Sequence, residues 1–489
     1  MDYKIEDQSP ESKNDREIPT EKERLSRLID PPQSADFKAH DARTAFVPGV
    51  VHVVVKEGID GRRIAKRLQD TEDDADFGAN LSVLRNLLKE HRLLRVEATF
   101  DFTPPGLKPE ENPPRGRERY LTLYFESEQN TRIISEKLTD TALIDRAVPA
   151  PTIIPPSSPL GEPLMTPRTI HARPAQWYIP RCNADRGWQL KGPGQFFSGQ
   201  GVVVADLDWG FRTDHKDFEG RIENRYNSIS GDDFVSNDLG HTIYHGTAVL
   251  GLLGAGANGV GMSGFAFGSN LWAVQADDGL DHRPAPLFQS WWFAVDYVRR
   301  TDSNGRRKVI CLEAETGDYC NIESDESINR VIRDAIYEGV VVCVPAGNGD
   351  RDAGLSFTGM PIVETGSILV GATKFAEDGA NRKAITSNWG QRVVVSAPGD
   401  PTDDISCGSE HDLHYRNFGG TSGATPKVAG AVALMLEANP QLTHAEIRDI
   451  LNATGTQITD PGTKPIGTFL NVHAAICEAL RRAGQVCAA

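Results

Sequence analysis

The sequence GVVVADLDWG, residues 201–210, decides the fold of this chain. A short apolar run that begins after a glycine is typical of a strand buried on both faces, as in a parallel sheet. The run ends in two carboxylates, Asp206 and Asp208, and a glycine turn follows. Open α/β sheets place their sites at the carboxyl ends of strands. The stretch therefore predicts a parallel sheet whose carboxyl edge carries chemistry.

Further apolar runs bounded by turn residues follow along the chain, at 271–277, 308–314, 340–346 and 367–375. Segments with helical spacing separate them, among them RPAPLFQSWWFAVDYVRR and ESINRVIRDAIYEG. Alternating strands and helices predict a mostly parallel sheet with both faces covered. We therefore expect a three-layer α/β/α sandwich over residues 176–489.

Two more signatures complete a pattern that begins with the acid at 208. HGTAV starts at His245, and GGTSGATP places Ser422 just before a long helix of small apolar residues. A serine hydroxyl is a poor nucleophile until a base takes its proton, and His245 is the candidate base. The imidazole in turn needs an orienting carboxylate, the role predicted for Asp208. The chain order Asp, His, Ser predicts a catalytic triad.

These motifs resemble those of the subtilisin-like serine peptidases, the subtilases, over about residues 195–480. DWG and HKDF resemble the family's D-[ST]-G and H-P-D-L, HGTAV its H-G-T-x-V, and GTSGATP its G-T-S-x-A-x-P. NGVGMSGFAFGSNL, VPAGNG and SNWGQRVVVSAPG match further family segments in order. The resemblance implies a serine endopeptidase that works through an acyl-enzyme on Ser422. It also implies that Asn348 of VPAGNG donates to the oxyanion.

The resemblance implies no required cofactor. It allows structural calcium, for which we assign no ligand. Two rival functions stay open: a catalytically silent pseudo-protease that binds peptides, and a regulatory protein whose N-terminal module recruits a partner. Labelling of Ser422 by a fluorophosphonate would exclude the silent form.

Several motifs also have simpler interpretations. Asp206 lies two residues before Asp208 on the same side of the strand and could orient the histidine instead, although Asp208 keeps the family spacing. Asn348 could be only a turn former, and Ser422 only the start of a helix. GAGANG at 254–259 satisfies a dinucleotide motif but lacks the strand before it and the helix after it. His241 has the spacing of a metal pair with His245, yet no glutamate lies between them as in H-E-x-x-H.

The sequence departs from the family near the predicted binding groove. The segment that normally ends in S-L-G reads CLEAETGD and brings three acids, Glu313, Glu315 and Asp318. They could favour basic substrate side chains, or they could point to solvent. Trp209 replaces a small hydroxyl residue after the triad aspartate, and Gly423 follows the serine where the family has Met or Ser.

The N-terminal part has a different pattern. Residues 1–46 are polar and acidic, and we expect them to be disordered. Residues 47–149 show the order β-α-β-β-α-β of a ferredoxin-like α+β unit, with an insertion at 73–91. Its position resembles that of the subtilase propeptide, an intramolecular chaperone and inhibitor, although a binding module is the alternative. A proline-rich linker at 150–175 is a natural place for cutting.

Composition restricts partners and location. The formal net charge of −16 argues against nucleic-acid binding, and no apolar stretch is long enough for a membrane helix. We therefore expect protein or peptide substrates, the chain's own N-terminal unit as a partner, and no nucleic acid or membrane. The charged N-terminus carries no secretory signal, which favours the cytoplasm without excluding another export route. The 7 cysteines are too scattered for a disulfide scaffold.

Overall fold

The computed structural model describes most of the chain beyond residue 45. The described residues are 46–69, 77–99, 117–126, 130–151, 153–154, 176–192, 194–235, 243–258, 261–277, 287–376, 378–410, 414–459 and 461–487. The predicted disordered segment, apart from Phe46, and most of the predicted linker lie outside these ranges.

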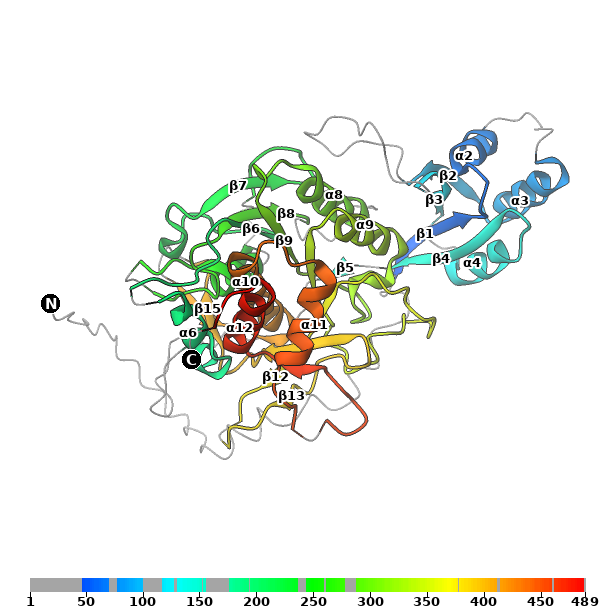
Figure 1. Cartoon of the computed structure of the whole chain (residues 1–489). Coiled ribbons are helices and arrows are strands. Elements are labelled where there is room, and N and C mark those ends of the chain that lie inside the picture. The colour runs from blue at the N-terminus through cyan, green and yellow to red at the C-terminus, as the bar shows by residue number, and fades with distance from the viewer. Residues whose placement is uncertain are drawn as a thin grey trace, which may run out of the picture. The chain divides into compact units, whose positions relative to one another are not determined.

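A nine-stranded sheet forms the centre of the larger part (Figure 1). The strand order is β17-β14-β12-β11-β9-β6-β8-β7, and all of these strands pair in parallel. Their bounds are β6 Val202–Asp208, β7 Ile222–Asn227, β8 Asn270–Gln275, β9 Arg307–Leu312, β11 Val341–Pro345, β12 Ile368–Lys374, β14 Val393–Pro398 and β17 Thr468–Phe469. The short β13 (Arg382–Lys383) pairs with β12 in the antiparallel sense. The quoted stretch at 202–208 is the interior strand β6, buried along its whole length.

Helices cover both faces of this sheet. On one face α8 (Leu287–Arg300) packs against α9 (Glu326–Tyr337) and against β6 and β9. On the other face α10 packs against the sheet and against two neighbouring helices, α7 and α12. The helices of that face are α7 Ile243–Gly254, α10 Gly420–Ala438, α11 His444–Thr454 and α12 Val472–Arg482. The predicted three-layer sandwich is confirmed.

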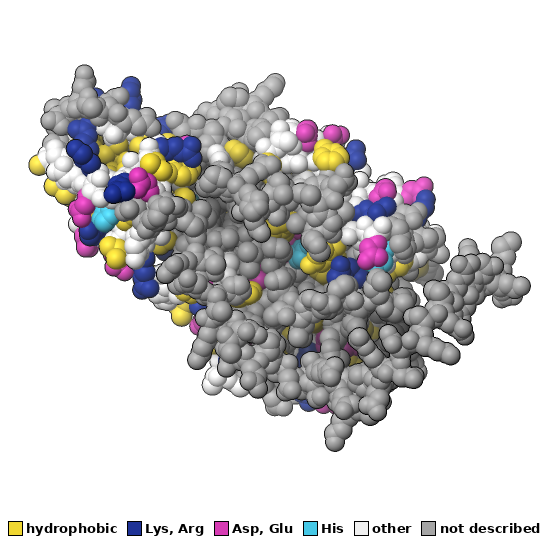
Figure 2. All heavy atoms as spheres, turned by 180° about the vertical axis from the view of Figure 1, so that it is seen from behind, with side chains coloured by type: hydrophobic (Ala, Val, Ile, Leu, Met, Phe, Trp, Pro, Cys, Tyr) yellow, Lys and Arg dark blue, Asp and Glu magenta, His cyan; other side chains and the backbone are white. Residues whose placement is uncertain are grey.

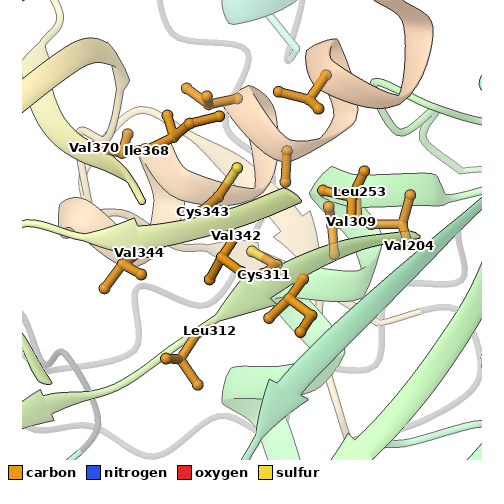
Figure 3. Close-up of a cluster of buried hydrophobic side chains, with 14 of the residues drawn as sticks. Val204, Leu253, Val309, Cys311, Leu312, Val342, Cys343, Val344, Ile368 and Val370 are labelled. Carbon is orange, nitrogen blue, oxygen red and sulfur yellow. The ribbon is translucent and has the colours of Figure 1, made fainter. Parts of the chain in front are cut away.

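Small branched side chains of the strands make up much of the core between the sheet and its helices. Figure 3 shows Val204, Val309 and Val342 of adjacent strands together with Leu253 of α7. Such residues suit a strand buried on both faces, because they fill the pleated surface without polar atoms. Cys311 and Cys343 lie in the same core and are fully buried, as expected for small hydrophobic residues.

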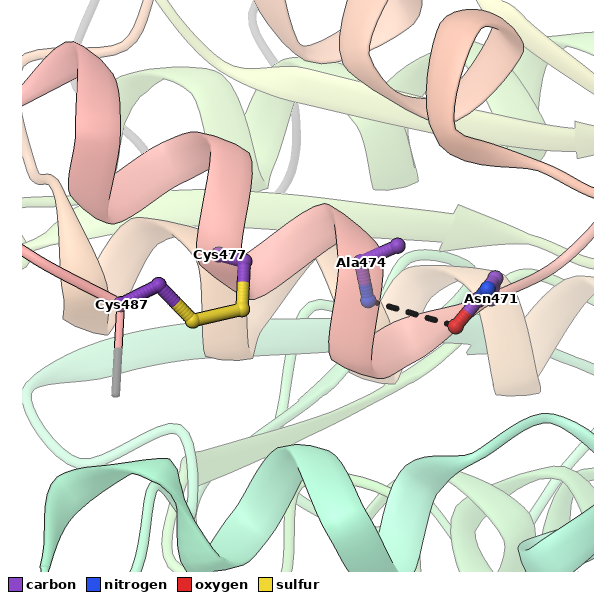
Figure 4. The surroundings of a disulfide bond; sticks show 4 residues. All are labelled: Asn471, Ala474, Cys477 and Cys487. Atoms are coloured by element: carbon purple, nitrogen blue, oxygen red, sulfur yellow. Dashed lines mark hydrogen bonds between the residues drawn. A yellow bond between two sulfur atoms is a disulfide. The ribbon is translucent and has the colours of Figure 1, made fainter. Parts of the chain in front are cut away.

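Short elements complete this part of the chain. They are α5 Tyr178–Arg181, α6 Ala184–Trp188, β10 Glu315–Thr316, β15 Ile405–Cys407, β16 Tyr415–Asn417 and the single-turn helices at Gln189–Lys191, Lys216–Phe218 and Ile322–Ser324. Cys477 of α12 forms a disulfide with Cys487 (Figure 4), and the other five cysteines are free and buried.

The N-terminal part is a four-stranded antiparallel sheet in the order β2-β3-β1-β4. Its elements are β1 Phe46–Val55, α2 Gly61–Gln69, α3 Gly78–Glu90, β2 Leu93–Ala98, a single turn at Arg117–Arg119, β3 Tyr120–Phe125, α4 Thr131–Thr139 and β4 Ile144–Pro151. The extra helix α3 is the predicted insertion. The sheet and its helices have a core of their own, which includes Val53, Ile64 and Leu138. Residues 45–489 form one compact unit, so the predicted domain boundaries stay predictions.

Two surface properties bear on partners. Among the described residues, no helix is long and apolar enough to cross a membrane. Where described side chains are visible in Figure 2, basic and acidic groups lie interspersed on that face.

Candidate active site

Four predicted site residues lie on segments at or near the carboxyl edge of the large sheet. Asp208 is the last residue of β6, and His245 lies in the first turn of α7. Asn348 follows β11, and Ser422 lies in the first turn of α10. All four are at most 3% exposed in the full chain.

The histidine is held by the aspartate that ends β6. His245 Nδ1 lies 2.7 Å from Asp208 Oδ2 and 3.0 Å from Oδ1. The backbone N–H of Trp209 donates to Asp208 Oδ1 at 2.6 Å. The Trp209 ring meets the His245 ring edge-on, with centroids 5.9 Å apart. The unusual tryptophan therefore supports the Asp–His pair both through its backbone and by packing.

Asp206 takes no part in this contact. It is fully buried, and neither of its carboxyl oxygens has a hydrogen-bond partner among the described residues. Burial, together with the neighbouring charges of Asp208 and Glu313, raises the pKa of Asp206 well above its usual range. Burial also raises the pKa of Asp208, but His245 and the Trp209 N–H oppose this shift. The environment of Asp206 therefore favours its neutral form, and Asp208 is the acid that faces the histidine.

Ser422 lies beside a carboxyl group that the sequence placed near the groove. Burial, and next the charge of Asp208, raise the pKa of Glu313 well above its usual range, while the Cys311 thiol and the Ser422 hydroxyl act in the opposite direction. His245 Nε2 accepts no hydrogen bond from the described residues. The structure thus joins His245 to Asp208 and does not show the bond from Ser422 to His245. Such bonds are often long until a substrate is bound.

Both polar atoms of the Asn348 side-chain amide form hydrogen bonds. Its Oδ1 accepts the Thr421 backbone N–H at 3.0 Å, and its Nδ2 donates to Glu315 Oε2 at 3.3 Å. Gly420, next to Thr421, has φ +71°, and a Cβ atom there would lie 3.0 Å from Asn348 Oδ1. A glycine is needed at that position for both reasons. Asn348 therefore connects the turn after β11 to the start of α10, which a mere turn former would not do.

The three acids near the predicted groove are engaged inside the protein. Glu313 and Glu315 are fully buried, and the Asp318 side chain is 6% exposed. Glu313 accepts from the Cys311 thiol, Glu315 binds Asn348, and Asp318 pairs with Arg351 at 3.0 Å. None of the three points to solvent, and the suggested preference for basic substrates stays a prediction.

The contact between Glu315 and Asn348 is the main site feature that sequence reasoning missed. The two residues are 33 positions apart: Glu315 begins β10, and Asn348 lies in the turn after β11. The sequence showed an acid at position 315, but no pattern in the sequence predicted which residue the Glu315 side chain contacts.

The structure describes five of the six residues of GAGANG, and of the two histidines of the metal spacing it describes only His245. Gly254 is the last residue of helix α7 and Gly256 lies just after it, whereas a dinucleotide site needs a preceding strand. His241 lies outside the described residues, and the Nδ1 of its partner His245 is bound to Asp208.

The buried carboxylate of Asp217 is a potential ligand for calcium. Its Oδ2 accepts from Tyr415 and from the Met262 N–H, while Oδ1 has no hydrogen-bond partner among the described residues. The potential metal ligands grouped with it are those of His215 and Cys407. Calcium takes six to eight oxygen ligands, so this imidazole–thiol–carboxylate group does not fit calcium.

Comparison with known proteins agrees with this geometry. A model of the subtilase family matches residues 199–466. Subtilisin from Bacillus pumilus is 31% identical over 294 residues, which cover 59% of this chain and 96% of that protein. Subtilisin E from Bacillus subtilis (strain 168) is 31% identical over 294 residues, covering 59% of this chain and 69% of that protein.

A solved structure shares the fold. The crystal structure of fervidolysin from Fervidobacterium pennivorans, a keratinolytic enzyme related to subtilisin, superposes with a TM-score of 0.58 at 17% identity. The match covers 88% of this chain and 61% of the fervidolysin chain. Taken together, the fold, the ordered motifs and the matched length show that this chain belongs to the subtilase family and is a serine endopeptidase.

Proposed function

We propose that this endopeptidase uses Ser422 as its nucleophile, His245 as its general base, Asp208 to orient the histidine and Asn348 as an oxyanion donor. The observation that carries the proposal is the 2.7 Å contact between His245 Nδ1 and Asp208 Oδ2. That contact keeps the proton on Nδ1, so that Nε2 can accept one from the serine.

The reaction follows from these positions. Ser422 Oγ attacks the scissile carbonyl carbon and gives its proton to His245 Nε2. The backbone N–H groups at the start of α10 and the Asn348 amide bind the oxyanion that forms. His245 then protonates the leaving amine, and water hydrolyses the acyl-enzyme by the same route. The substrates are proteins or peptides, and no step requires a cofactor.

The test compares the wild-type chain with Ser422→Ala. We expect a fluorophosphonate to add its mass to the wild type alone, and peptide hydrolysis to fall at least 10³-fold in the variant. Labelling at a different residue, or equal hydrolysis by both chains, would contradict the assignment of Ser422. Circular dichroism of the variant shows whether its fold is kept.

We further propose that the N-terminal sheet acts as an intramolecular inhibitor and chaperone. His52 of β1 lies 2.9 Å from Asp325, the residue that caps α9, and Arg146 of β4 pairs with Glu326 at 3.2 Å. After β4, the short strand β5 (Ile153–Ile154) pairs antiparallel with Glu315–Thr316. A segment that adds a strand beside Asn348 would compete with an extended substrate. A folding aid also suits a parallel sheet, because the contacts within such a sheet are non-local.

Intact mass and activity, followed together in time, test this second proposal. We expect peptidase activity to rise as the wild-type chain is cut within the predicted linker at 150–175, while Ser422→Ala stays intact. Full activity in a chain that has not been cut would contradict an inhibitory role.

The disulfide predicts the cellular compartment of the protein better than the N-terminal sequence does. The Cys477–Cys487 bond favours an oxidising compartment, because cytosolic thiols are kept reduced. The predicted cytoplasmic location stays a prediction, and we propose an oxidising compartment instead. Counting reactive thiols in denatured protein purified without reductant tests this: five are expected with the disulfide, seven without it.

A further inference from the structure

One carboxylate outside the proposed triad touches the proposed oxyanion donor. Glu315 is fully buried, and its Oε2 accepts the backbone N–H of Asn348 at 2.7 Å and the side-chain Nδ2 at 3.3 Å. An asparagine Nδ2 carries two hydrogens. One of them is directed to Glu315, which leaves the other for an oxyanion.

This arrangement has opposing effects on the reaction. Holding the amide fixes the direction of the donor, and a fixed donor stabilises an oxyanion better than a mobile one. The charge of Glu315 does the opposite, because it lies beside the place where negative charge develops. With the oxyanion about 3 Å beyond Nδ2, the two charges would be roughly 6 Å apart, and their repulsion slows the reaction about 100-fold at an effective dielectric constant near 20.

Protonation of Glu315 would separate the two effects. A neutral carboxyl group still accepts hydrogen bonds through its carbonyl oxygen, so it can still hold Asn348. It no longer carries the charge that repels the oxyanion.

Several titratable groups surround Glu315. Glu313 lies at the end of β9, and the charge of Glu315 contributes to the raised pKa of its carboxyl group. In the turn after β10, burial and then the charge of Glu315 raise the pKa of Tyr319. The charge of Glu315 also contributes to the raised pKa of Cys320, and Asp318, which acts on the same thiol, is bound to Arg351.

We propose that Glu315 is a positioning residue of the oxyanion hole, and that the peptidase turns over fastest when Glu315 carries a proton. The inference rests on the proposed role of Asn348. We expect activity to decline as Glu315 ionises.

The test is the pH dependence of peptide hydrolysis from pH 4 to 10 by the activated wild type and by Glu315→Gln, with the exposed Glu219→Gln as control. We expect a descending alkaline limb in the wild type and in the control, and none in Glu315→Gln. At pH values where Glu315 is ionised, the variant should have a kcat up to about 100-fold above wild type, with KM unchanged. On the acid side the wild type and Glu315→Gln should converge.

A purely structural role would lower kcat at every pH without changing the shape of the profile, and that result would overturn the proposal. A wild-type rate that stays level up to pH 10 would also overturn it, whether or not Glu315→Gln folds. Should that variant not fold, Glu315→Ala replaces it, since it too must lack the alkaline limb.

Fluorophosphonate labelling separates this inference from the proposed function. Absence of labelling in both the wild type and Glu315→Gln at all pH values would refute the role of Ser422. Labelling of Ser422 with an identical pH profile in the two chains would refute only the role of Glu315.

Discussion

The two sides of the proposed site both contain a buried carboxylate, yet the two carboxylates should affect the reaction differently. On the histidine side, Asp208 contacts His245, which becomes a cation during the reaction. On the asparagine side, Glu315 contacts Asn348, which binds an anion. The same chemical group is therefore favourable on one side and, when charged, unfavourable on the other. The partner decides the effect of a buried charge.

The largest expected effect separates the two acids of β6. Asp208→Asn should lower kcat about 10⁴-fold, because an amide favours the wrong tautomer of the histidine. Asp206→Asn should lower it less than tenfold, because Asp208 and not Asp206 contacts His245, and burial raises the pKa of Asp206 so that its neutral form is favoured. Steady-state kinetics on one peptide substrate measures both. A larger loss in Asp206→Asn than in Asp208→Asn would reverse our assignment.

A third buried carboxylate, Asp404, belongs to neither side of the proposed site. It has a cationic partner, whose effect should be on the stability of the fold and not on the reaction. Asp404 accepts from Lys427 Nζ at 2.5 Å, both side chains are fully buried, and burial raises the pKa of Asp404 to about 6. Lys427→Met leaves the carboxylate without its cation and should cost about 3–5 kcal/mol in the free energy of unfolding at pH 7.5.

Urea denaturation in the Ser422→Ala background, which prevents self-digestion, measures this cost. At pH 5 the cost should be smaller, because Asp404 can then take up a proton in the folded variant. An equal cost at both pH values would show that the charge of Asp404 is not the cause.

On the asparagine side, Asn348→Ala should lower kcat about 10²–10³-fold with little change in KM, as expected for a donor that acts in the transition state. The exposed Asn452→Ala in α11 is the matched control and should behave as wild type. A change in KM alone would assign Asn348 to substrate binding and not to the oxyanion.

The smallest expected effect is a loss of folding stability at low pH. It must be known before a fall in activity at low pH is assigned to the active site. Burial lowers the pKa of His444 to about 4. Because the folded state resists protonation, His444 stabilises the fold fully above about pH 6.5, and this stabilisation is lost as pH falls towards 4, by up to about 3 kcal/mol.

In the Ser422→Ala background, His444→Gln should lose less stability than its parent between pH 7 and 4.5. Chemical denaturation at both pH values gives this difference. Equal losses in the two proteins would place the acid sensitivity elsewhere.

The sequence predicted the order of the site residues along the chain but did not predict all of their contacts. Asp208 was preferred over Asp206 on spacing alone, and the structure places Asp208 against His245. Trp209 had no explanation from the sequence, because its support of the Asp–His pair depends on a helix that lies 37 residues away from Asp208.

By itself the sequence determined the parallel sheet, its two helical layers and the order of the reactive groups. These depend on local periodicity, on turn residues and on motifs within single segments. Only the tertiary structure decided that Asp206 has no hydrogen-bond partner within the described ranges, that Glu315 binds Asn348 and that Cys477 pairs with Cys487. The direction and burial of such side chains depend on how separate segments pack together, and no pattern within one segment contains that information.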